Sequence, residues 1–89
     1  MFKKRALERI VRSFGNHRRI EMIELLENNP ELSLTEIADR LKINLQTASE
    51  HIRKLTMASL VMKKSQGKNI RHKLTLRGIN ILTFLKNLK

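Results

Sequence analysis

The stretch from Ser33 to Val61, SLTEIADRLKINLQTASEHIRKLTMASLV, decides the fold of this chain. Its apolar residues recur at helical spacing on both sides of a short break, which predicts two helices joined by a tight turn. Ser33 and Glu36 fit a capping box, in which each side chain accepts a hydrogen bond from the other residue's backbone N–H. Asn44 is in position to cap the second helix. The first helix is expected to bury Leu34, Ile37, Ala38 and Leu41.

The helix that follows Asn44 has two different faces when its residues are placed at about 100° per step. The inward arc is predicted to hold Leu45, Ala48, Ile52 and Leu55. The outward arc holds Gln46, Thr47, Glu50, Arg53 and Lys54, with Ser49 and His51 at its flanks. This helix is expected to end near Ala58 and Ser59. Its outer face is polar and partly basic.

The rest of the chain predicts three more helices and a hairpin. Helical spacing indicates a helix over residues 3–14, and a second helix after an Asn16 cap that ends at residues 28–30, where Pro30 disfavours helical geometry before it. Residues 60–64 and 69–76 read as two strands around the turn 65–68. Thr75 is expected to cap a last helix to about residue 88. The predicted fold class is mainly α with a small β-hairpin, in one domain over residues 1–89.

The formal charge of +11 is segregated along the chain. Residues 1–19 carry seven Lys or Arg and one Glu, residues 20–39 carry six acids and no Lys or Arg, and residues 40–89 carry twelve Lys or Arg and one Glu. A surface that was only solvated would mix its signs. The basic excess after residue 39 therefore predicts a polyanionic partner for the second helix of the pair and for the hairpin.

Other classes of protein find little support. There is no cysteine, no apolar run long enough to span a membrane, and no signal-peptide pattern, so a cytoplasmic protein without disulfides is expected. No phosphate-cradling glycine loop or nucleophile–base pair indicates an enzyme. His17, His51 and His72 do not have zinc-ligand spacing, so neither a metal nor a cofactor is predicted. We expect His51 to be packed or hydrogen-bonded.

The last helix carries more apolar surface than one small core needs. Its apolar residues span well over half of the circumference, whereas packing on one neighbour needs a stripe of a little over about 100°. A second copy of the chain is the simplest cover, and a deep groove within one monomer is the alternative. A homodimer through the N- and C-terminal helices is therefore predicted.

The chain resembles the winged helix-turn-helix regulators of the arsenical-repressor (ArsR-like) type. The resemblance lies in residues 33–41 (SLTEIADRL), residues 47–55 (TASEHIRKL) and Leu60-Val61. Residues 74–78 (LTLRG) are similar to a strand-to-helix junction of the multiple-antibiotic-resistance-repressor (MarR-like) type. Such proteins are typically homodimeric repressors that insert the second helix of the pair into the major groove of DNA.

The resemblance, together with the outward arc, predicts the residues that contact DNA. On the helix they are Gln46, Thr47, Ser49, Glu50, Arg53 and Lys54. On the hairpin, which forms the wing of this fold, they are Lys63, Lys64, Lys68 and Arg71. Ser49 is implied to lie near a phosphate, and Gln46, Thr47 and Glu50 to read bases.

Three departures from the family pattern matter. The thiolate sensor sites of such regulators need cysteine, which this chain lacks. Ser59 stands where the pattern has Gly before Leu-Val, so a positive φ there would strain it. Glu50 lies within the basic outer face, where phosphate would repel it but a cytosine amino group could donate to it.

We therefore predict a homodimeric repressor that binds duplex DNA in a sequence-specific way. Single-stranded nucleic acid is less favoured because its binding sites use aromatic platforms. Phe14 and Phe84 fall on core-type positions, which leaves Phe2 as the spare ring. A non-specific nucleic-acid-binding protein, and a winged-helix adaptor whose basic face meets an acidic protein, remain the alternatives.

Overall fold

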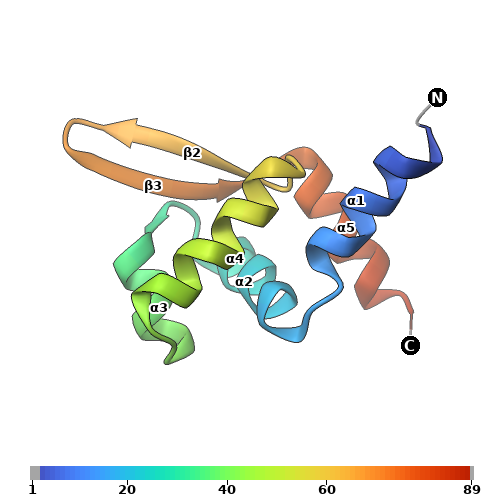
Figure 1. The fold of residues 1–89 in the computed structure, drawn as a ribbon. Helices are drawn as coiled ribbons and strands as arrows, with labels where there is room; N and C mark the ends of the chain where they lie inside the picture. The colour runs from blue at the N-terminus through green and yellow to red at the C-terminus, as the bar shows by residue number, and fades with distance from the viewer. Residues whose placement is uncertain (1–2, 89) are drawn as a thin grey trace.

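The computed structural model describes residues 3–88, which form five helices and three strands. Figure 1 shows the helices and the hairpin of the two longer strands. In chain order these are α1 (Lys4–Phe14), α2 (His17–Asn28), β1 (Leu32–Ser33), α3 (Leu34–Leu41), α4 (Leu45–Met57), β2 (Val61–Gln66), β3 (Asn69–Leu74) and α5 (Leu76–Lys86). The predicted fold class is confirmed. Across residues 3–88, no helix has both the length and the apolar character needed to cross a membrane.

Side-chain caps fix where the helices begin. The Asn16 side chain accepts from the backbone N–H groups of Arg18 and Arg19 at the start of α2. Thr75 caps α5, because its hydroxyl accepts from the Gly78 N–H at 3.0 Å. Both caps were predicted and are confirmed. In each case a side-chain oxygen accepts from backbone N–H groups that have no partner within the first turn of the helix.

The sheet has the order β1-β3-β2 and is antiparallel throughout. The hairpin turns at Gly67-Lys68, and Gly67 adopts the left-handed φ of 59° that such a tight turn requires. The turn is two residues shorter than predicted, and β3 ends at Leu74 because Thr75 already caps α5. The strand β1 was not predicted, since two residues are too few to show an alternating pattern.

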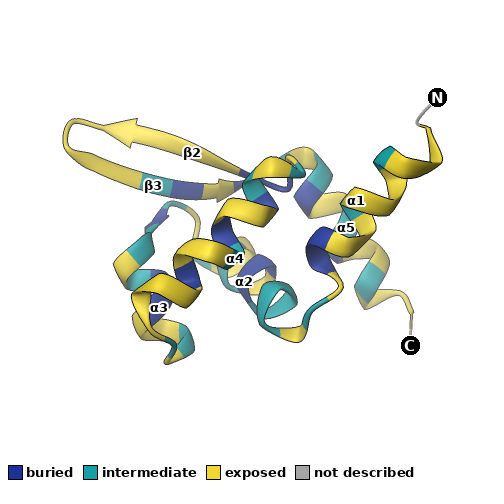
Figure 2. Cartoon of the chain, in the orientation of Figure 1, coloured by how far each residue is buried: buried dark blue, intermediate teal, exposed yellow. Residues whose placement is uncertain are grey.

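The core lies where α2, α3 and α4 meet the base of the hairpin (Figure 2). Its largest fully buried side chains are Met22, Ile23, Leu26, Ile37, Leu55, Leu60, Leu82 and Val61. Gly78 lets the start of α5 approach this core closely, because a Cβ there would clash with the backbone oxygen of Leu60. The packing sets α4 across the middle of the molecule, with the hairpin projecting to one side (Figure 1).

Several apolar residues expected inside lie at the surface. Ile70 and Leu76 fall within the predicted strand over residues 69–76, on the same side as His72 and Leu74. Both are exposed, because Ile70 lies on the part of the hairpin that extends beyond the core, and Leu76 begins α5. Phe84 was placed on a core-type position, yet it is 56% exposed in the single chain because α5 turns Leu82 toward the core instead. Phe2 lies outside the described residues.

The two terminal helices keep several apolar side chains exposed in the single chain. These are Leu7 and Val11 of α1 and Leu76, Ile79 and Phe84 of α5.

Candidate nucleic-acid interface

Side-chain caps fix the first turns of α3 and α4. The Glu36 N–H donates to the Ser33 hydroxyl at 3.2 Å, and the Ser33 N–H donates to the Glu36 carboxylate at 3.0 Å, which is the predicted capping box. The Ser33 hydrogen bonds lower the pKa of Glu36 and keep its carboxylate charged. Lys42 ends α3 with a left-handed φ of 56°, and Asn44 begins α4 by accepting from the Thr47 N–H at 2.7 Å. The turn is therefore only Lys42, Ile43 and Asn44.

The helix α4 presents one buried and one exposed face. Ala48, Ile52 and Leu55 are buried, as predicted. The predicted outward residues, which are Gln46, Thr47, Ser49, Glu50, Arg53 and Lys54, are all exposed. The structure thus brings the six helix residues of the predicted site onto one accessible surface.

Leu45 is an exception on this helix. It was predicted on the inward arc, but its side chain is 51% exposed. As the first residue of α4 it has no preceding helical turn, and its side chain leans away from the centre of the helix. It lines a shallow depression with Leu34, Gln46, Ser49 and Glu50. An apolar side chain therefore stands beside the polar residues at the N-terminal end of the exposed face.

Part of the positive charge on the exposed face of α4 is neutralised by an acid of the same helix. Arg53 donates from Nη2 to Glu50 Oε1 at 2.6 Å and from Nε to Glu50 Oε2 at 3.2 Å. This hydrogen bonding lowers the pKa of Glu50 and raises that of Arg53, so both groups stay ionised. The third Arg53 nitrogen, Nη1, lies 3.2 Å from the sulfur of Met57. The guanidinium is therefore held flat against the helix.

The four predicted wing residues fall into two groups. Lys63 and Lys68 are exposed and carry no ion pair among residues 3–88. Lys64 lies 3.4 Å from the Glu31 carboxylate, and Arg71 donates to the Glu36 carboxylate at 3.2 Å and to the Glu31 carbonyl oxygen at 2.9 Å. The two Arg71 contacts connect the hairpin to Glu31 and to the first turn of α3. Of the four predicted wing residues, only Lys63 and Lys68 therefore carry a positive charge that no acid of the described chain pairs with.

Sequence reasoning left Lys73 out of the site. It is exposed on β3, and its register partner on β2 is Met62. Lys73 follows Arg71 by two residues in the predicted strand 69–76, and residues at this spacing share one face, so the signal was present in the sequence. Lys73 adds a cation to the wing that has no ion-pair partner within the described chain.

Two of the three histidines, His51 and His72, make hydrogen bonds within the fold. His51 Nδ1 accepts from Arg19 Nε at 3.0 Å, which confirms the expectation of a hydrogen-bonded residue. Burial, and then the charge of Arg19, lower the pKa of His51. His72 is buried and its Nδ1 donates to the Leu32 carbonyl at 3.0 Å. Within residues 3–88 no three His, Asp or Glu side chains are grouped so that they could hold a metal ion.

A helix pair with an exposed polar second helix and a basic hairpin beside it defines a winged helix-turn-helix domain. Residues 16–61, just over half of the chain, match the sequence model of a family described as winged helix-turn-helix DNA-binding. The chain belongs to this family. DNA binding and a non-enzymatic role follow from that membership and agree with the sequence-based predictions. No curated protein matches the chain.

Solved structures show the same fold over nearly the whole chain. A homodimeric winged helix-turn-helix domain of Mb0332 from Mycobacterium bovis, described as "a possible ArsR-family transcriptional regulator", is 21% identical with a TM-score of 0.84, covering 94% of this chain and 82% of its own. HlyU from Vibrio cholerae is 22% identical with a TM-score of 0.81, covering 98% and 97%. An ArsR-like regulator from Rhodococcus is 21% identical with a TM-score of 0.76, covering 90% and 74%. At these identities the likeness is one of fold, and the chain is structurally similar to ArsR-type regulators.

Proposed function

We propose that this protein is a sequence-specific transcriptional regulator that binds duplex DNA through α4 and the wing. The observation that carries the proposal is the contrast between the two faces of α4, where Ala48, Ile52 and Leu55 are buried and six polar residues are exposed. An α-helix presented in this way fits the major groove. Gln46, Thr47 and Glu50 are proposed to read base edges.

The remaining site residues are proposed to contact the phosphate backbone. On α4 these are Ser49, Arg53 and Lys54, and on the wing they are Lys63, Lys64, Lys68 and Arg71. Lys63 and Lys68 are the strongest wing candidates, since Lys64 and Arg71 would have to leave Glu31 and Glu36 to engage a phosphate fully. Contacts of this kind position the protein and supply most of the salt-dependent affinity.

The regulator is proposed to act as a homodimeric repressor, with residues 1–89 as a single domain. The exposed Leu7, Val11 and Phe84 support a dimer through α1 and α5, because these apolar side chains need a cover. The Mb0332 domain of the same fold is described as homodimeric. In a two-fold dimer the two α4 helices would enter successive major grooves about 34 Å apart. Occupying a promoter in this way would exclude polymerase.

The test is the affinity for random duplex and for a duplex selected from a random pool, measured over a range of salt. If six or more phosphates are contacted, affinity should fall about 10³- to 10⁵-fold between about 50 and 200 mM salt. Arg53→Ala should weaken binding while circular dichroism and melting stay native. Absence of binding to duplex at low salt would contradict the proposal and favour an adaptor that meets an acidic protein.

A further inference from the structure

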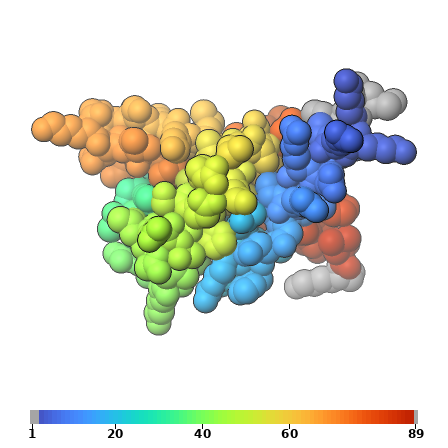
Figure 3. All heavy atoms as spheres, in the orientation of Figure 1, coloured from blue at the N-terminus to red at the C-terminus, as the bar shows by residue number. Residues whose placement is uncertain are grey.

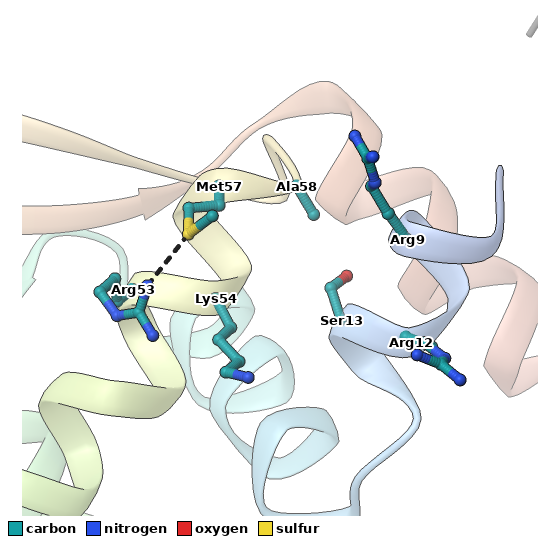
Figure 4. Close-up of a pocket in the computed structure, with 7 residues that line it drawn as sticks. All are labelled: Arg9, Arg12, Ser13, Arg53, Lys54, Met57 and Ala58. Atoms are coloured by element: carbon teal, nitrogen blue, oxygen red, sulfur yellow. Dashed lines mark hydrogen bonds between the residues drawn. The ribbon is translucent and has the colours of Figure 1, made fainter. Parts of the chain in front are cut away.

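A cationic groove lies between α1 and the C-terminal half of α4, and we call it the α1–α4 groove. Its volume is about 350 Å³, and it is lined by Arg9, Arg12, Ser13, Arg53, Lys54, Met57 and Ala58. Figure 4 shows the α1 residues on one wall and Arg53, Lys54 and Met57 on the other. Four of the seven lining residues are cations, and none is an acid.

Most of this positive charge is not neutralised. Arg9 and Lys54 have no hydrogen-bond or ion-pair partner anywhere in the described part of the chain. Arg12 has only a loose, exposed contact with Glu8, at 3.9 Å. Arg53 is the one lining cation that an acid holds closely, at 2.6 Å from Glu50. The groove therefore offers three cationic side chains to an anion.

The two walls of the groove are held in register by Arg19 of α2. Its Nε donates to His51 of α4 at 3.0 Å, and its Nη1 donates to the Ser13 carbonyl oxygen of α1 at 3.3 Å. One side chain thus links α1, α2 and α4. This link helps to hold the cations of α1 and those of α4 on facing walls within the single chain.

The groove is continuous with the proposed DNA-binding surface. Arg53 and Lys54 belong to both. In Figures 1 and 3, α1 lies on the same visible side of the molecule as the exposed face of α4, while α5 lies behind. On α1 the arginines Arg5, Arg9 and Arg12 share a face about opposite Leu7 and Val11. The basic face of α1 can therefore meet DNA while its apolar face packs on another copy of the chain.

We propose that the α1–α4 groove binds a backbone phosphate of the duplex that α4 reads, with Arg9 and Arg12 as phosphate ligands. This inference rests on the proposed function. Duplex DNA carries one negative charge for about every 1.7 Å of its axis, so a duplex lying on α4 brings phosphates to this adjoining groove. Arginine suits the role because its planar guanidinium can donate two hydrogen bonds to one phosphate. Binding there would extend the footprint from α4 toward α1.

The experiment measures how the affinity for a random duplex depends on salt for four proteins. These are the wild type, Arg9→Gln, the double variant Arg9→Gln/Arg12→Gln, and Lys86→Gln. Lys86 pairs with Glu27 outside the groove, so this last variant removes one cation from a different place. The slope of log affinity against log salt should become shallower by about 0.9 for each phosphate that the variant no longer neutralises, which weakens binding about eightfold at 0.1 M salt. The Lys86→Gln slope should stay that of the wild type.

Three results would overturn the proposal. The first is a double variant with the slope of the wild type. The second is an equally shallow slope in Lys86→Gln, which would show that only net charge matters. The third is that inorganic phosphate binds saturably to the wild type and not to Arg9→Gln, while the salt slope for duplex is the same in both proteins. This result would identify the groove as a site for a small anion. A wild type that bound no duplex would instead remove the proposed function, so the two failures are distinguishable.

Discussion

Glu50 and Arg53, three residues apart on the exposed face of α4, form a two-point ion pair. Nη2 and Nε of the arginine donate to the two carboxylate oxygens at 2.6 Å and 3.2 Å. Both residues are proposed to bind DNA, so the pair ties a base-reading acid to a phosphate-binding cation. In the free chain, part of the positive charge of α4 is therefore cancelled.

Replacing Glu50 with Gln should raise affinity for random duplex and lower the preference for a selected site. The change removes an acid that phosphate repels and releases the Arg53 guanidinium. At the base edge it replaces a charged acceptor by a neutral amide that both donates and accepts, which weakens the preference for a cytosine amino group. Titration with both duplexes at one salt concentration measures the two effects. Unchanged affinity for random duplex would show that the Glu50–Arg53 pair does not weaken the attraction of α4 for phosphate.

Phe84→Glu should convert the proposed dimer into monomers that still fold. The side chain is 56% exposed in the single chain, so an acid there costs the isolated fold little but opposes burial between copies. Sedimentation equilibrium gives the association state. Thr35→Glu is the matched control, because it adds the same charge at an exposed position on α3. A Phe84→Glu protein as dimeric as this control would exclude α5 from the interface.

Ser59→Gly should stabilise the fold. Ser59 adopts φ 61°, the left-handed region that costs a residue with a Cβ roughly 1 kcal/mol or more. Glycine removes that strain, although its greater freedom in the unfolded chain offsets part of the gain. Urea unfolding gives the free energy, and Ser59→Ala is the control that keeps the Cβ. Equal stability of the two variants would show that the position is not strained.

The structure should lose stability as pH falls below the ordinary histidine range, in part through His72. Burial lowers the pKa of His72 from its ordinary 6.5, and the Leu32 hydrogen bond opposes this only in part. Below about pH 6.5 the unfolded chain therefore binds more protons at His72 than the folded chain does. The contribution of His72 to the free energy of unfolding is complete above about pH 6.5 and is lost as the pH falls toward the pKa of His72 in the folded chain. Urea unfolding should therefore show a smaller loss of stability between about pH 7 and about pH 5 for His72→Gln than for the wild type. Parallel curves would contradict this assignment.

Local patterns were enough to predict the helix pair, because caps act within a few residues. Ser33 with Glu36, Asn44 and Thr75 all cap as their spacing indicates. Leu45 and Phe84 show the limit of periodicity. Periodicity places a residue on one face of a helix, but it shows neither where the core ends nor whether another chain covers that residue.

Long-range pairs escaped prediction for a different reason. Arg71 meets Glu36, and Lys64 meets Glu31, across separations of more than thirty residues, and no local pattern encodes such a pairing. The hydrogen bond from Arg19 to His51, which joins α2 to α4, is of the same kind. Charge segregation identified the basic half of the molecule, but these pairings decide which cations stay available to DNA.

Above all, we propose that α4 reads the sequence of duplex DNA. The most direct test is the ratio of affinities for a selected and a scrambled duplex at one salt concentration, compared between the wild type, Gln46→Ala and Lys68→Ala. We predict that Gln46→Ala lowers this ratio about 5- to 150-fold, which corresponds to about 1–3 kcal/mol of discrimination, with an unchanged salt slope. Lys68→Ala should keep the ratio and reduce the slope by about one unit. A Gln46→Ala protein that keeps the full wild-type ratio would contradict the claim.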